Sequence, residues 1–259
     1  MKDNLRIALT FSGGGYRAAT FHLGALSYLH SVKVGEFTLL DHVVALSTIS
    51  GGTITGLRYM LGLSRGESVT DIFKELYTFL TDVELATVAM NNLASYEKGQ
   101  CASLIRTMAD IYNKELFKGA VLGDLMDQLD DIHICHFAAN ATDFTNGLAF
   151  RFQVTEKTGA KQEQATGYGL IGNNKIRIPR EVARHIRLSE VLACSSCFPS
   201  GFEPLVFPKD FVLGDSEEVK KFIAKTEPFG IMDGGIVDNQ GIEPILLAEQ
   251  RMETSLGCK

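Results

Sequence analysis

The first sixty residues alternate between two hydrophobic patterns. Apolar residues occupy every second position from Leu5 to Phe11, which predicts a half-buried strand, and then recur at helical spacing from Phe21 to Leu29. A continuous apolar, β-branched run over 43–49 predicts a second strand, and helical spacing returns over 54–61. This order of strand, helix, strand and helix predicts an α/β protein.

The rest of the chain contains more helix than strand. Residues 66–130 have an almost wholly helical pattern, and within them Leu85, Val88, Ala89 and Leu93 form an apolar stripe. Further predicted elements are strands at 132–141 and 148–154, helices at 181–186, 189–197 and 217–224, a strand ending at Asp233 and a last helix from Pro244. Residues 159–174 form a polar, glycine-containing loop, and we find no internal repeat.

Composition fits one globular domain. The chain has 259 residues, 45% of them hydrophobic, and a formal net charge of −6. This charge disfavours binding to nucleic acid and simple electrostatic adsorption to anionic membranes. No apolar run reaches the roughly 18 residues of a membrane span, and the start leads directly into a strand, without a signal peptide. We therefore expect a cytoplasmic protein, or a domain of a larger chain.

Two groups of residues resemble redox or metal motifs. Cys194 and Cys197 have C-x-x-C spacing, but they lie inside a predicted helix, so packing is favoured over redox chemistry. His133 and Cys135 would face one side of a predicted strand and His136 the other, so these ligands do not converge. The five cysteines have no framework spacing, which predicts reduced thiols. We expect no metal site.

The second strand stops at Ser50, which is followed by Gly51 and Gly52. A serine on such a turn can present its hydroxyl as a nucleophile, because it projects from the sheet beside a helix N-terminus. Serine is also a preferred N-cap. Taken alone, this segment leaves both interpretations open.

A triple glycine, Gly13 to Gly15, follows the first strand and begins a helix. Its backbone N–H groups can bind an anionic oxygen. With Ala18 it matches the dinucleotide pattern G-x-G-x-x-A, which also needs an acidic residue at the end of the next strand. Glu36 has about the right separation but precedes that strand, so an oxyanion hole for acyl transfer is favoured, with a purely structural turn as the alternative.

Asp233 ends a short apolar strand and is followed by Gly234 and Gly235. Asp-Gly alone is more often a turn than a catalytic site. Together with the glycine turn and the serine turn, it completes a three-part pattern in which each part follows a strand.

These segments resemble motifs of the patatin-like phospholipases. Ser12–Arg17 is similar to the glycine-rich oxyanion motif of that family, Thr48–Gly52 to its nucleophile motif and Asp233–Gly235 to its aspartate motif. Residues 139–143 and 193–199 resemble a central strand and a small-residue helix of the family more loosely. The resemblance implies a three-layer α/β/α sandwich with a mostly parallel central sheet. It implies one domain over 1–259, with 66–130 as a helical insertion.

The resemblance also implies a mechanism. No histidine follows Asp233, and the last one is His185, so a Ser-His-acid triad in the usual chain order is not expected. The family instead implies a Ser50–Asp233 dyad that cleaves esters of phospholipids or related lipids through an acyl-enzyme. Gly13, Gly14 and Gly15 would form the oxyanion hole, Arg17 would brace the glycine loop, and neither metal nor nucleotide cofactor is needed.

Two positions depart from the family pattern. Thr48 stands where the G-x-S-x-G motif has glycine, and Ala18 replaces a glycine that often follows the arginine. Neither removes a reacting group, but a catalytically weak or inactive lipid-binding protein on the same fold stays an alternative. The helical insertion could form a lipid-facing cap, and its contact with a membrane would then be peripheral and hydrophobic. The sequence predicts neither the head group nor the oligomeric state.

Overall fold

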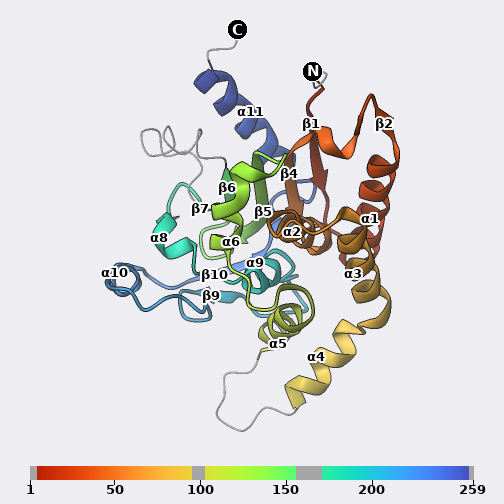
Figure 1. Ribbon diagram of the computed structural model, residues 1–259. Coiled ribbons are helices and arrows are strands. Elements are labelled where there is room, and N and C mark those ends of the chain that lie inside the picture. Colours follow the sequence, from red (N-terminus) through yellow and green to blue (C-terminus); the bar gives the residue numbers. More distant parts are fainter. Residues whose placement is uncertain (1–4, 95–102, 156–170, 257–259) are drawn as a thin grey trace.

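The computed structural model describes residues 5–94, 103–155 and 171–256 (Figure 1). The strands are β1 Ile7–Phe11, β2 Lys33–Val34, β3 Phe37–Thr38, β4 Val43–Ile49, β5 His136–Asp143, β6 Leu148–Thr155, β7 Ile171–Gly172, β8 Arg177–Ile178, β9 Leu205–Phe207 and β10 Phe229–Asp233. The α-helices are α1 Gly15–Ser31, α2 Gly51–Ser64, α3 Val69–Asp82, α4 Leu85–Ala94, α5 Leu104–Tyr112, α6 Leu122–Gln128, α8 Arg180–Ala183, α9 Leu188–Ser195, α10 Glu217–Lys225 and α11 Ile242–Leu256.

One central sheet contains eight of these strands, in the order β1-β4-β5-β6-β7-β8, and β10 pairs with both β5 and β9. Strands β1, β4 and β5 are parallel, and the other pairs are antiparallel. The expected parallel pairing therefore holds for the part of the sheet that carries the two glycine turns. The chain enters α1 and α2 at the carboxyl ends of β1 and β4. Because these two strands are parallel neighbours, the glycine turn and the serine turn lie at the same end of the strands.

Helices cover both faces of this sheet, as expected for a three-layer α/β/α sandwich. On β4, Leu46 and Thr48 point toward Gly56 of α2, whereas Ser47 and Ile49 point toward Gly241, directly before α11. Helices α1, α2 and α9 lie together on the α2 side, and α11 contacts β1 and β4 from the other (Figure 1).

Helix α2 forms the centre of the core. All of its residues from Gly51 to Gly62 are buried, which is typical of a helix with protein on every side. Its start lies against β1 so closely that a side chain on Gly52 would overlap the Phe11 carbonyl oxygen. The paired glycines after Ser50 therefore permit the close contact of helix and strand.

The helical region 66–130 forms as expected, through α3, α4, α5, a π-helical turn Asn113–Phe117 and α6. The predicted stripe on α4 does not form one exposed face. Leu85 and Ala89 are buried, Val88 is exposed, and the side chain of Leu93 lies outside the described residues. Leu85 and Ala89 pack inward because α4 lies against α5, which is the usual role of such a stripe.

Other predictions had mixed outcomes. The strand predicted from residue 132 begins at His136, so His133 and Cys135 precede it. Within the described ranges no group of three or more His, Cys, Asp or Glu could hold a metal ion. Cys135, Cys194 and Cys197 are free thiols, whereas Cys101, Cys258 and most of the 159–174 loop lie outside the described residues. Among the helices that are described, none is long and apolar enough to cross a membrane.

Candidate active site

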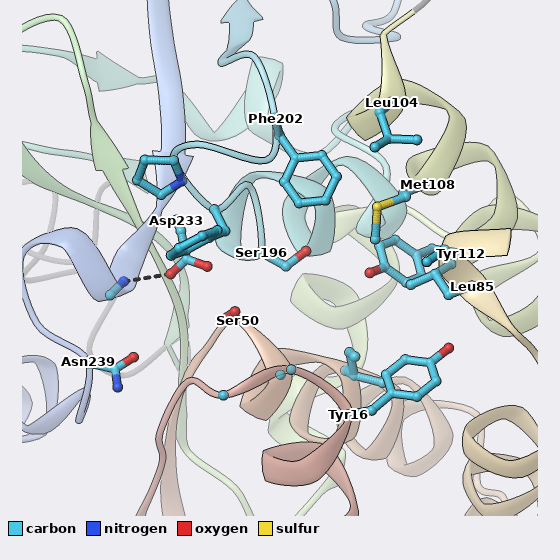
Figure 2. Close-up of a pocket in the computed structure, with 18 of the residues that line it drawn as sticks. Tyr16, Ser50, Leu85, Leu104, Met108, Tyr112, Ser196, Phe202, Asp233 and Asn239 are labelled. Atoms are coloured by element: carbon cyan, nitrogen blue, oxygen red, sulfur yellow. Dashed lines mark hydrogen bonds between the residues drawn. The ribbon is translucent and has the colours of Figure 1, made fainter. Parts of the chain in front are cut away.

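Ser50 lies on a sharp turn between β4 and α2, with φ 50° and ψ −120°. Positive φ is uncommon for a residue other than glycine and marks a strained backbone, which surrounding contacts must hold. Ser50 is the N-cap residue of α2, but its side chain makes no capping hydrogen bond. The capping interpretation is therefore wrong. The hydroxyl points toward Asp233 (Figure 2).

Strand β5 brings Ser50 and Asp233 together. Strands β4 and β10 pair with the same edge of β5 from opposite directions, since β6 occupies the other edge. Ile49 pairs with Asn140, and Asp233 pairs with the next residue, Ala141. The end of β4 and the end of β10 therefore meet, although their residues are far apart in sequence.

Asp233 has the environment of a general base. The residue is 5% exposed, and its Oδ1 accepts a hydrogen bond from the Gly235 N–H at 2.7 Å (dashed line in Figure 2). Burial raises the pKa of this carboxyl, while hydrogen bonds from the Gly235 N–H and the Ser50 side chain partly oppose the shift. A carboxylate with a raised pKa accepts a proton more readily near neutral pH.

The glycine turn lies beside Ser50. Gly14 and Gly15 have φ of 142° and 62°, which favours glycine at both positions. Both line the cavity in front of Ser50, at the N-terminus of the 17-residue helix α1. A side chain on Gly51 would overlap the Gly15 backbone, so the glycine turn and the serine turn are in direct contact.

Gly13 has a different environment from its two neighbours. Its N–H donates to the Asn239 carbonyl at 3.2 Å, and a side chain at this position would overlap the Asn239 amide oxygen. Asn239 lines the cavity and was not identified from the sequence. The only feature of the sequence that could have pointed to Asn239 is its position six residues after Asp233.

The residue expected to brace the glycine loop makes no hydrogen bond or ion pair with it. Arg17 is exposed, and in the described part of the chain no hydrogen bond or ion pair joins it to another residue. His22, one turn further along α1, is buried, stacks on Phe11 and hydrogen-bonds the Ser12 carbonyl at 3.1 Å. Burial lowers the pKa of His22. In the sequence, the place of His22 among the apolar positions of the predicted helix could have indicated that it is buried.

Thr48 is accommodated without displacing Ser50. Its hydroxyl donates to the Ala138 carbonyl at 3.3 Å and accepts from the Thr53 hydroxyl at 3.1 Å. Its methyl points at Gly56, where any side chain would overlap it. The threonine that departs from the family motif therefore fits because α2 has a glycine opposite it.

A cavity of about 1220 Å³ opens in front of Ser50 and Asp233. Leu85 of α4, Leu104, Met108 and Tyr112 of α5, and Phe202 contribute to its lining (Figure 2). Its ionisable acidic residues are Asp233 and Glu84, and no Lys, Arg or His of the described ranges lines it. The helical region 66–130 thus forms one wall, and the cavity suits an apolar chain.

The half-buried Ser50 thus faces the buried Asp233 where β4 and β10 of the α/β sheet meet. Comparison with known proteins gives the family. The Patatin-like phospholipase model matches residues 9–246, and the chain belongs to this family of lipid acyl hydrolases.

A search of curated proteins gave no match. Among solved structures, the chain is similar to the crystal structure of VipD from Legionella pneumophila, with 13% sequence identity and a TM-score of 0.46. The match covers 91% of this chain and 47% of VipD, so the chain spans about half the length of that protein.

Proposed function

We propose that this protein cleaves carboxylic esters of phospholipids or related lipids through a Ser50–Asp233 dyad. The observation that carries the proposal is the strained Ser50, whose hydroxyl faces the buried Asp233 carboxylate at the base of an apolar cavity. In this arrangement a hydroxyl nucleophile, a base with a raised pKa and space for an acyl chain meet at one point.

The proposed reaction has two steps. Asp233 accepts the Ser50 proton as Oγ attacks the ester carbonyl, and the tetrahedral intermediate collapses to an acyl-enzyme as the departing alkoxide takes that proton. Asp233 then takes a proton from a water molecule, which attacks the acyl-enzyme, and it returns this proton to Ser50 Oγ as the fatty acid departs. We assign stabilisation of the oxyanion to the N–H groups of Gly14 and Gly15, because the Gly13 N–H donates to Asn239.

The cavity supports an acyl chain as the part of the substrate that is bound. Leucine, methionine and aromatic side chains form most of its wall, and burying each methylene of a chain there is worth about 0.8 kcal/mol. The polar head group would stay near the mouth, where Glu84 is exposed.

We also propose that the mouth contacts a lipid surface. Met90 of α4, Phe198 and Ile236 line the cavity and are 58%, 61% and 43% exposed. We call these three residues the apolar rim. They come from three distant segments around one opening, so an acyl chain could pass from a lipid surface into the cavity without crossing water. This rim takes the role that the sequence suggested for the α4 stripe.

The non-catalytic alternative was based on Thr48. Since Thr48 is hydrogen-bonded and its methyl faces Gly56, the departure does not weaken the case for catalysis. The dinucleotide alternative needs an acid at the end of β4, and Glu36 instead lies in the turn between β2 and β3.

The proposal is tested by ester hydrolysis with purified protein. Wild-type protein should hydrolyse short p-nitrophenyl esters and release fatty acid from phospholipid micelles, and Ser50→Ala should abolish both activities. Ser64→Ala, at the end of the same helix, is the matched control and should be fully active. Equal activity of Ser50→Ala and wild type would overturn the assignment.

A further inference from the structure

The C-terminal end of α9 contacts the backbone of both Ser50 and Asp233. The Ser195 hydroxyl accepts a hydrogen bond from the Ser50 N–H at 2.9 Å. Two residues later, the Cys197 carbonyl accepts a hydrogen bond from the Asp233 N–H at 3.0 Å. One short segment therefore holds the backbone of the proposed nucleophile and of the proposed base, which come from different strands.

The Ser195 hydroxyl has three hydrogen-bonding partners. It donates to the Asn140 carbonyl at 2.7 Å, accepts from Ser50, and lies 2.8 Å from the Thr53 hydroxyl. The Thr53 hydroxyl, which also hydrogen-bonds the Thr48 hydroxyl, has one proton and donates it to one of these two oxygens at a time. The side chain is fully buried, so water cannot replace these partners.

The position of these contacts matters because the Ser50 backbone is strained. A non-glycine residue with φ 50° relaxes unless neighbouring contacts hold it. The Ser50 N–H is held by Ser195 and the Ser50 carbonyl accepts from the Thr53 N–H at 2.9 Å, so α9 and α2 hold the turn from two sides.

We propose that Ser195 is a positioning residue that, together with the Cys197 carbonyl, sets the placement of Ser50 relative to Asp233. It acts through the Ser50 backbone and does not touch the substrate, since it does not line the cavity. The inference rests on the proposed function, because its effect on rate presupposes that Ser50 and Asp233 react.

Ser195→Ala tests the inference. Removing the hydroxyl leaves the Ser50 N–H and the Asn140 carbonyl without this partner, and the turn can relax. A displacement of about 1 Å at reacting atoms costs up to about 100-fold in rate. We expect kcat on a short soluble ester to fall by about 10- to 100-fold with little change in KM, as for an interaction that matters only in the transition state.

Ser189→Ala is the matched control, since Ser189 is also buried on α9 but contacts neither Ser50 nor Asp233 in the structure. It should retain wild-type kcat. If Ser195→Ala does not fold, Ser195→Cys preserves the volume while the thiol remains a poor hydrogen-bonding group, and the same loss of kcat is expected.

The pH profile separates positioning from a general loss of stability. The Ser50 side chain hydrogen-bonds the Asp233 carboxylate and lowers its pKa, against the effect of burial. If the turn relaxes, this bond is lost, the pKa rises, and the acid limb of kcat/KM moves to higher pH. The neighbouring Cys197 thiol does not interfere, because burial raises its pKa to about 12.

The outcomes distinguish this inference from the proposed function. If wild-type protein shows no esterase activity, the proposed function fails. If wild type is active, and Ser195→Ala or Ser195→Cys matches Ser189→Ala in both kcat and acid limb, the inference is wrong and the proposed function stands. A reduced kcat with a shifted acid limb, at temperatures where each variant is folded, supports it.

Discussion

At the scale of single residues, the chemistry depends on the environment of Asp233 more than on its identity. An ordinary aspartate has a pKa near 4 and is a weak base at neutral pH. Burial raises the pKa of Asp233, and its hydrogen bonds from Gly235 and Ser50 keep enough of the ionised form to react. The same burial is unfavourable for folding, since an ionised carboxylate has been removed from water.

Asp233→Asn should therefore separate stability from activity. We expect a loss of about three orders of magnitude or more in kcat, as for other disabled catalytic units. A folded-state pKa raised above its unfolded value contributes stability at low pH that is lost as pH rises through it. At pH 8 the melting temperature of Asp233→Asn should thus equal or exceed that of wild type. Full activity of the variant would assign the base to another carboxylate.

At the scale of elements, sequence patterns located β1, α1, β4, α2 and β10 because each has a recognisable apolar pattern next to a glycine turn. They could not locate the two-residue strands β2, β3, β7 and β8, whose length is too short for a period. They also could not show that β4 and β10 share one edge of β5, because strand pairing depends on the whole sheet.

The sequence could predict the candidate site only where a local motif marks the residue. Ser50, Asp233 and the glycine turn carry local motifs, so the sequence could propose them, and the fold brings them together. Asn239, Ser195 and His22 act through backbone contacts that only the fold creates, and Arg17, which stands in a motif, makes no such contact in the described structure.

The packing of β4 against α2 makes a quantitative prediction. Gly56→Ala should destabilise the protein by about 1–3 kcal/mol, because the new methyl overlaps the Thr48 methyl in a packed core. Thr48→Ser removes the opposing methyl and keeps the hydroxyl. In the double variant, Gly56→Ala should lower the free energy of unfolding much less. Urea unfolding of wild type, the two single variants and the double variant should therefore show a favourable coupling energy. Additive effects would mean that Thr48 and Gly56 do not accommodate each other.

At the scale of the whole molecule, the helical region 66–130 and the ends of β4 and β10 line one cavity with an apolar rim. The net charge of −6 and the exposed Glu84 disfavour anionic surfaces, so contact with a lipid surface should be hydrophobic and insensitive to salt.

The double variant Phe198→Ser with Ile236→Ser tests the rim. Sedimentation with zwitterionic phosphatidylcholine vesicles should show binding reduced by roughly tenfold or more, because two apolar side chains no longer leave water. Tyr28→Ser is the matched control, since Tyr28 is 66% exposed but lies in the last turn of α1, away from the cavity. Equal binding of all three proteins would show that the rim does not contact lipid.

The most direct test of the central claim is the intact mass of the protein after reaction with a fluorophosphonate probe, which modifies an activated serine whatever the substrate. Wild-type protein should gain the mass of one probe, peptide mapping should place it on Ser50, and Asp233→Asn should react far more slowly. A wild-type protein that gains no mass, or one labelled at Ser12 or Ser47 with Ser50→Ala labelled equally, would contradict the account.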